Sequence, residues 1–291
     1  MILIEYLSKI SVLLFPIASM FAVGLSFTFT QIVRPLRYPD RVFRALVANF
    51  ILVPLLAIGI ARLFSYDNSL TSGIALVGMA AGAPFLLKLT QVANADVRLS
   101  ASLLVILMPL TVIYMPLAVP LVIKGVSVNA IGIAIPLILT MLLPLLIGHL
   151  LDSFFPGLAL HLQPVARHSS SIALVTIVVT TLVLHGSLFR GLFGTGAVLG
   201  AIILTAGGFA IGYLISSQGF NRRTVMGLGA GQRNIAAALV VATQDFNDPK
   251  MLTMIVLFSV IDLMVLFPIA VILRRRSMPP KYDAERRSDA R

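Results

Sequence analysis

Long apolar stretches alternate with short polar segments along most of the chain. This pattern predicts nine membrane spans, at residues 6–27, 43–64, 70–91, 98–123, 130–151, 170–188, 194–216, 224–244 and 251–273. Each stretch has about the 20 residues that an α-helix needs to cross a bilayer. A backbone inside the bilayer must satisfy its own hydrogen bonds, so we expect an all-α polytopic membrane protein.

The composition supports a membrane protein and argues against an enzyme. Hydrophobic residues make up 58% of the chain and charged residues 11%, against about 25% charged residues in soluble domains. The chain has no cysteine, which excludes disulfides, thiolate nucleophiles and cysteine-ligated metals. No HExxH, GxSxG or P-loop motif is present, so we predict no enzymatic activity and no cofactor.

The formal charge of +11 is distributed unevenly. Most lysines and arginines fall in one set of alternating loops and in the tail, whereas the opposite loops hold Arg62, Lys124, Arg190 and Lys250. Cytoplasmic loops carry the basic excess. We therefore predict an inner (plasma) membrane protein with its N-terminus outside and its C-terminus in the cytoplasm. The charge is then a topology signal and argues against a nucleic-acid partner. The polar tail, residues 277–291, is expected to be disordered.

Two segments of the chain resemble each other. GMAAGAPF at Gly78–Phe85 matches GLGAGQRN at Gly227–Asn234, and each is followed by a polar break and a long apolar span. The predicted topology gives the two copies opposite orientations, as in the inverted repeats of secondary transporters. We expect two crossed helices to unwind at Gly82, Pro84, Gly229 and Gly231. Close helix packing through small residues is the alternative.

These segments also carry a family resemblance. PIASMFAVGLSF, RALVANFILVPLLAIGIARLF, GMAAGAP…VANADVRLS and GLGAGQRNIAAALVVA resemble the bile acid:sodium symporter family, of which this chain would be a divergent, bacterial-type member. The resemblance covers most of the chain and implies one transporter domain over residues 1–276. It further implies a panel domain near 6–27, 130–151 and 170–188, and a core domain near 43–123 and 194–273.

The resemblance implies two sodium ions at the crossing of the broken helices, but most of the family's ligand positions are changed. The substituted positions are Gly229 at a glutamate, Arg233 at a glutamine, Leu86 and Leu87 at a serine–asparagine pair, and Leu104 at a threonine. Asn49, at a family glutamine, and Ser100, at a serine ligand, are the residual sodium-site positions. Leucine and glycine side chains offer no oxygen to sodium, so the family's sodium coupling is expected to be lost.

Three of the ionisable residues inside predicted spans are functional candidates. A basic side chain at mid-membrane costs about 2.5–3.5 kcal/mol on insertion scales, which makes it a functional candidate. Arg233 could occupy the place of a bound cation or hold an anionic substrate; its alternative is pairing with Asp262 or with unwound carbonyls. Lys88 could bind the same anion or extend to the membrane interface. Asp262 could be the counter-ion of Arg233 or a protonatable coupling residue.

Three uncharged side chains complete the candidate binding site. Asn49, Gln232 and Asn234 could hydrogen-bond a polar substrate, or could instead join helices to one another. We predict a secondary transporter, surrounded by membrane lipid, that moves a small organic anion by alternating access without sodium. Two alternatives stay open: coupling to protons through Asp262 or to no ion, and a non-transporting sensor or binding protein on the same fold.

Overall fold

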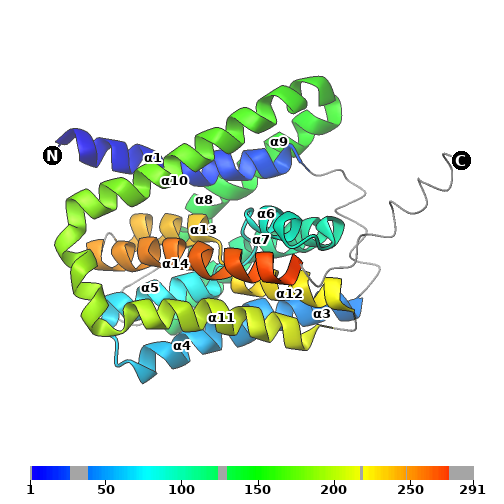
Figure 1. Cartoon of the computed structure of the whole chain (residues 1–291). Coiled ribbons are helices and arrows are strands. Elements are labelled where there is room, and N and C mark those ends of the chain that lie inside the picture. The colour runs from blue at the N-terminus through cyan, green and yellow to red at the C-terminus, as the bar shows by residue number, and fades with distance from the viewer. Residues whose placement is uncertain (1, 27–38, 124–129, 217–218, 247, 275–291) are drawn as a thin grey trace, which may run out of the picture.

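The computed structural model describes residues 2–26, 39–123, 130–216, 219–246 and 248–274 (Figure 1). Within these ranges the chain is helical and has no strand, which confirms the predicted all-α class. Eight helices are long and apolar enough to cross a membrane. The chain is therefore a multi-pass membrane protein by fold and composition. The predicted tail, residues 277–291, lies outside the described residues.

The helices follow the predicted apolar stretches closely. In chain order they are α1 (Ile2–Gly24), α3 (Pro39–Val47), α4 (Val53–Leu63), α5 (Asn68–Met79), α6 (Leu86–Val92), α7 (Val97–Val122), α8 (Ala130–Leu137), α9 (Leu143–Phe154), α10 (Pro156–Leu192), α11 (Ala197–Ile215), α12 (Phe220–Gly231), α13 (Ile235–Val241) and α14 (Pro249–Arg274). Three π-helical turns, η2 (Ala48–Leu52), η3 (Ile138–Leu142) and η5 (Ala242–Phe246), and one 3₁₀ turn, η4 (Phe193–Thr195), connect them.

Proline positions explain two of the π-helical turns. Pro54 stands in the first turn of α4, directly after η2, and Pro144 stands in the first turn of α9, directly after η3. Proline has no backbone N–H, so the carbonyl that would normally receive it is left free. The helix adjusts by widening locally into a π turn. Helices α3 and α4, and likewise α8 and α9, thus form two continuous spans.

The predicted span 70–91 consists of two short helices. Helix α5 has 12 residues and α6 has 7, and the segment between them contains Gly82 and Pro84. Neither helix alone is long enough to cross a bilayer, so this span is absent from the eight spanning helices. The count of nine crossings and the inverted repeat stay predictions.

The second interruption lies at Gln232–Asn234, between α12 and α13. The expectation that the helix unwinds at Gly229 and Gly231 is wrong, because both residues are helical and end α12. Close packing explains Gly231 instead: a Cβ atom there would lie 3.0 Å from Leu266 Cδ2 and 3.1 Å from a carbonyl oxygen. The small residues bring α12 against its neighbours, and the chain unwinds just after them.

Helix α10 is much longer than the predicted span 170–188. It runs from Pro156 to Leu192, and its one residue with non-helical backbone angles is His185. The segment expected to connect two spans is therefore helical. This places Arg167 on a helix wall.

The molecule has two layers in Figure 1. Helices α1, α9 and α10 contact one another along its upper side, and α4, α5, α11, α12 and α14 lie below them. The backbones of α1 and α9 nearly touch, since a Cβ atom on Gly24 would lie 2.2 Å from Leu145 O. The upper layer contains the stretches predicted as a panel domain. The division into panel and core stays a prediction.

Candidate functional site

The two helix interruptions contact each other through Asn234. Its backbone N–H donates to Ala80 O at 2.8 Å, and its side-chain Nδ2 donates to Gly82 O at 3.1 Å. Its Oδ1 accepts the backbone N–H of Ala237 at 3.2 Å and caps the start of α13. A single buried side chain thus satisfies both unwound segments. This contact supports the alternative reading of Asn234, in which it joins helices.

The first interruption is held from α7. Gly82 has a φ of +76°, and a Cβ atom there would lie 2.8 Å from Met108 N, so only glycine fits without strain. The hydroxyl of Thr111 donates to Ala81 O at 3.0 Å and lies 3.2 Å from Ala81 N. Unwound backbone at membrane depth needs such partners, because no lipid group can replace them.

The second interruption carries a fully buried arginine, Arg233, whose side chain is 1% exposed. Its guanidinium group donates to five oxygen atoms, and we call these atoms the oxygen cage. They are Val77 O at 3.2 Å, Gly78 O, Ala230 O at 3.4 Å, Asn49 Oδ1 at 3.0 Å and Asn49 O at 3.4 Å. A guanidinium has five N–H donors, so the cage offers one acceptor for each.

The local backbone explains why free oxygens gather there. Val77 and Gly78 belong to the last turn of α5, and Ala230 belongs to the last turn of α12, where carbonyls lose their regular helical partners. Val77 O also accepts the N–H of Ala80 at 3.2 Å. In the π turn η2 the N–H of Val53 bonds to Ala48 O instead of Asn49 O. Pro54 follows and has no N–H to offer, which leaves Asn49 O for Arg233. Two negative helix ends therefore face one positive charge.

This geometry bears on three expectations. Arg233 was a candidate substrate-binding residue, but its donors are all directed at the cage, so none is left for a bidentate grip on an anion. Asn49 was a candidate of the same kind, and its Oδ1 faces Arg233. Asp262 was expected to be the counter-ion of Arg233. Among the described residues, the one ion pair joins Lys250 and Asp67, so Asp262 makes no direct pair with Arg233.

The residues at the family's sodium positions do not fit that ion. A Cβ atom on Gly229 would lie 3.4 Å from Leu86 Cδ2 and 3.6 Å from Leu103 Cδ1, so apolar side chains fill the surroundings of the missing glutamate. The hydroxyl of Ser100 donates to Val97 O in its own helix at 2.8 Å. Leu104 is fully buried. Sodium needs several oxygens, and these side chains supply one hydroxyl, which already has a partner.

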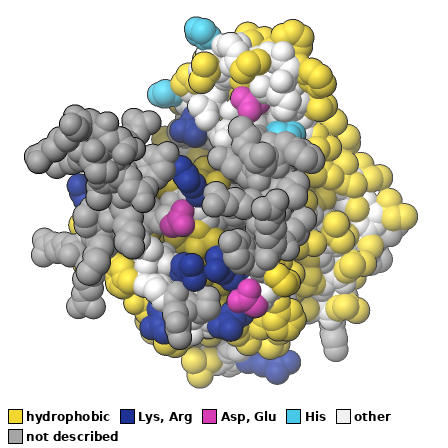
Figure 2. All heavy atoms as spheres, turned by 90° about the vertical axis from the view of Figure 1, so that its right-hand side faces the viewer, with side chains coloured by type: hydrophobic (Ala, Val, Ile, Leu, Met, Phe, Trp, Pro, Cys, Tyr) yellow, Lys and Arg dark blue, Asp and Glu magenta, His cyan; other side chains and the backbone are white. Residues whose placement is uncertain are grey.

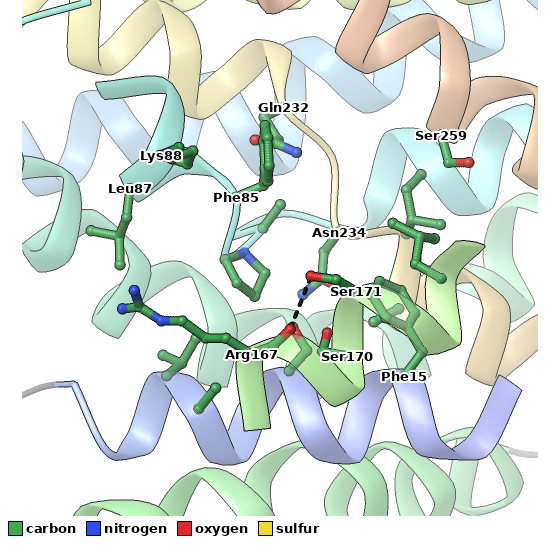
Figure 3. A pocket seen from close by; sticks show the side chains of 18 of the residues that line it. Phe15, Phe85, Leu87, Lys88, Arg167, Ser170, Ser171, Gln232, Asn234 and Ser259 are labelled. Atoms are coloured by element: carbon green, nitrogen blue, oxygen red, sulfur yellow. Dashed lines mark hydrogen bonds between the residues drawn. The ribbon is translucent and has the colours of Figure 1, made fainter. Parts of the chain in front are cut away.

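A cavity of about 510 Å³ lies between the two layers, next to the crossing (Figure 3). One wall comes from α1 and α10, and the other comes from both interruptions, α6 and α14. Of the predicted binding residues, Gln232, Arg233, Asn234 and Lys88 line the cavity. Asp262 lines it as well, whereas Asn49 does not.

The basic side chains gather at one end of the cavity. Lys88 and Arg167 are both exposed and line it from opposite walls. Figure 3 shows both at the end that also holds Leu87, while Ser259 and Phe15 lie at the other end. The hydroxyl of Ser26 on the cavity wall accepts from Gln163 Nε2 at 2.6 Å.

Sequence reasoning missed several residues of this cavity. Arg167, Ser170 and Ser171 were assigned to a connecting loop or left unassigned, yet they line it from α10. A usable signal was present, because the segment 156–169 contains only one proline beyond its first residue and continues directly into the apolar span. Figure 2 shows further basic side chains gathered on the right-hand face of Figure 1, with apolar side chains at the flank.

A multi-pass helical protein whose cavity adjoins two interrupted helices has the architecture of a secondary transporter. Comparison with known families agrees with that class. The model of the Sodium Bile acid symporter family matches residues 12–191, more than half of the chain. The chain therefore belongs to this family, which consists of membrane transporters and not of enzymes. The resemblance read from the sequence is thereby confirmed.

Individual relatives are distant. A probable sodium/metabolite cotransporter, BASS1 of Arabidopsis thaliana chloroplasts, is 26% identical over 238 residues, which cover 79% of this chain and 58% of the relative. The rice (Oryza sativa subsp. japonica) relative BASS2 is also 26% identical, over 79% of this chain and 56% of its own length. The chain thus spans less than two thirds of these plant proteins. The sodium-dependent transporter YocS of Bacillus subtilis is 24% identical over 78% of this chain and 72% of its own.

Proposed function

We propose that this protein carries a small organic anion across the inner (plasma) membrane by alternating access, without coupling to sodium. The observation that carries the proposal is the oxygen cage around Arg233. Its five oxygens enclose a positive charge that is covalently part of the chain. A free cation cannot enter the cage while the guanidinium fills it. The names of the plant and Bacillus relatives refer to sodium, and that property is theirs.

The preference for an anion rests on the cavity. Among the described residues, Lys88 and Arg167 are the two exposed cations on its walls, and Asp262 is the one acid. Phe15, Leu174 and other apolar side chains line the space between them. A compact organic body with one negative group matches this lining, because charge-assisted hydrogen bonds would hold the group at the basic end.

Alternating access requires the two layers to move relative to each other. The wall made by α1 and α10 belongs to the upper layer, and the wall made by the interruptions belongs to the lower one. Rocking between them would open the cavity to either side. With the N-terminus outside, as the arginine distribution predicts, the basic end of the cavity faces the cytoplasm.

Transport in proteoliposomes tests the proposal. A panel of labelled aromatic and aliphatic carboxylates is offered to vesicles in sodium chloride or in potassium chloride, and we expect equal uptake in both. Arg167→Gln and Lys88→Gln each remove a charged hydrogen bond worth about 1.5–3 kcal/mol, which predicts a loss of about tenfold or more in apparent affinity. Arg190→Gln and Lys9→Gln remove exposed cations away from the cavity and serve as matched controls.

Two results would oppose the proposal in different ways. Uptake that requires sodium would refute the role given to Arg233 and would mean that other oxygens bind the ion. Binding of the carboxylates without any uptake would instead favour a sensor or binding protein on the same fold.

A further inference from the structure

Asp262 is a buried acid near the middle of α14 (Pro249–Arg274), and it lines the cavity. Its side chain is 1% exposed, and its Oδ1 atom accepts no hydrogen bond. Buried carboxylates are usually paired or hydrogen-bonded at both oxygens, since an isolated ionised group in an apolar surrounding is costly. An acid kept in this state at mid-membrane indicates a function.

The immediate neighbours of Asp262 provide no positive charge in contact with it. The backbone N–H of Arg233 and the side chains of Thr205 and Gln232 lie beside the carboxyl group. The guanidinium of Arg233 acts on it through space, because its N–H groups are directed at the oxygen cage. Asp262 is therefore neither fully neutralised nor isolated from charge.

Other ionisable groups lie on the helices packed against α14. They are Lys88 on α6, His161, Arg167, His168, His185 and Arg190 on α10, Tyr213 on α11, and Arg222 and Arg223 on α12. Helices α5 and α13 carry none. Of this set, Lys88 and Arg167 share the cavity with Asp262, and they lie at its basic end. A proton on Asp262 would therefore be bound by the carboxyl itself and by its neutral neighbours.

Gln232 supplies the complementary partner for a proton. Its side chain is 5% exposed and lines the cavity, and its Oε1 atom also accepts no hydrogen bond. With Asp262 ionised, neither Asp262 Oδ1 nor Gln232 Oε1 receives a hydrogen, although the Gln232 side chain lies within hydrogen-bond reach of the carboxyl group. A protonated carboxyl has one O–H to donate, so a single proton can satisfy Asp262 and the Gln232 amide together.

We infer that Asp262 and Gln232 form a proton-binding site, at which one proton is taken up together with the transported anion. This inference rests on the proposed function, because the anion and Asp262 share one cavity. An anion in that cavity repels an ionised carboxylate and favours its protonation. The coupling is reciprocal, so the protein must bind the anion more tightly when Asp262 is protonated. The proton moves from cavity water to Asp262 Oδ1 and returns to water when the anion leaves on the other side.

The first test measures the proton without any substrate. Infrared spectra of the purified full-length protein, in potassium chloride, are recorded from mildly acidic to mildly alkaline pH. We expect a band from a protonated carboxyl group that disappears as pH rises and that is missing in Asp262→Asn. Glu5→Gln, which removes an exposed acid on α1, should leave the band unchanged. A band that is absent at every pH, or one that Asp262→Asn retains, would overturn the inference.

The second test measures the coupling with benzenesulfonate, an anion that cannot itself carry a proton in this range. Its dissociation constant for the wild-type protein should be at least about fivefold lower at mildly acidic than at mildly alkaline pH. In Asp262→Asn, which keeps the shape of the neutral carboxyl, the constant should be the same at both. Equal affinity at both pH values in the wild type would overturn the coupling.

The two tests separate the inference from the proposed function. If benzenesulfonate does not bind at any pH, the anion proposal fails, and the infrared titration still decides whether Asp262 binds a proton. If benzenesulfonate binds and is carried into vesicles, but its entry brings no proton measured by a trapped pH dye, the carrier stands and proton coupling is refuted.

Discussion

The two helix interruptions solve the same physical problem in different ways. At the first, between α5 and α6, the neutral hydroxyl of Thr111 bridges Ala81 N and O, and Gly82 adopts a positive φ. The second, between α12 and α13, contributes a charged side chain and an amide, Arg233 and Asn234, which donate to main-chain oxygens on both sides of the crossing. Unwound backbone in a membrane thus needs partners, but their chemistry is free to vary. A charge is used only where three interrupted or widened helices present carbonyls together.

The largest effect is expected from removing the charge. Arg233→Ala leaves four buried oxygens of the cage without the donor they have in the wild type, since Val77 O keeps the N–H of Ala80. The change should lower the free energy of unfolding by about 3–5 kcal/mol. Unfolding by dodecyl sulfate in mixed micelles measures this change. Arg233→Lys keeps the charge but has three donors where the guanidinium has five, so it should restore only part of the loss. A loss no larger than that of the exposed control Arg190→Ala would contradict the structural role of the cage.

The glycine of the first interruption comes next. Gly82→Ala forces a side chain into positive φ and against Met108 N, which should cost at least about 2 kcal/mol. Gly229→Ala is the matched control, because Gly229 is helical and a Cβ atom there would meet Leu86 at an ordinary 3.4 Å. That change should stabilise α12 by up to about 1 kcal/mol. Equal effects at the two glycines would show that the interruption is not conformationally strained.

The neutral partner of the first interruption is expected to contribute less than the charge of the second. Thr111→Val keeps the shape but removes the hydroxyl that bridges Ala81 N and O, at a cost of about 1–3 kcal/mol. Thr176→Val removes a hydroxyl that only returns to its own helix at Ile172 O, and should have little effect. Thermal unfolding in detergent measures both losses of stability, and their ratio reports what the hydroxyl of Thr111 contributes. A null effect at Thr111 would mean that the glycine geometry alone holds the interruption.

The smallest effect is expected outside the membrane, where Asp67 and Lys250 form an ion pair. Partial burial raises the pKa of Asp67, but the hydrogen bonds from Lys250 and Leu70 outweigh it and hold the pKa below its usual range. Because the pKa is lower when folded, the stabilisation is present above the unfolded pKa and is lost as pH falls through the folded one.

Asp67→Asn keeps a capping side chain at the start of α5 and removes this charge. It should lower stability by less than about 1 kcal/mol at neutral pH, since the pair is partly exposed. Melting curves of both proteins should converge at acid pH. A difference that persists in acid would assign the effect to the cap.

Periodicity and composition were sufficient for the helical class and for most span boundaries, and the resemblance of a few segments indicated the family. They failed where the answer depends on contacts distant in sequence. Gly229 looked like a helix breaker by its residue type, but it is helical, and a Cβ atom there would meet Leu86 at an ordinary distance. Arg167 was counted as a loop charge, since nothing local to it indicates that α10 forms a cavity wall.

The buried charges illustrate the same limit. The sequence marked Arg233 and Asp262 as exceptional, and both lie at the crossing. It could not assign their partners, because the choice between a carboxylate and main-chain carbonyls is made by α5 and by the π turn at Asn49. The chemical exception was visible in the residue types, whereas the pairing came from the fold.

A positive charge that is covalently part of the protein, such as that of Arg233, responds differently to voltage from a bound ion that dissociates into solution. Arg233 returns with the protein in every cycle, so its charge adds nothing to steady current, and the sodium gradient delivers no work through the cage. If the crossing shifts within the membrane field, however, that charge is displaced and driven back, at about 2.3 kcal/mol per full crossing for each 100 mV. A voltage step would then produce a brief displacement current without net flow, and Arg233→Gln would abolish it.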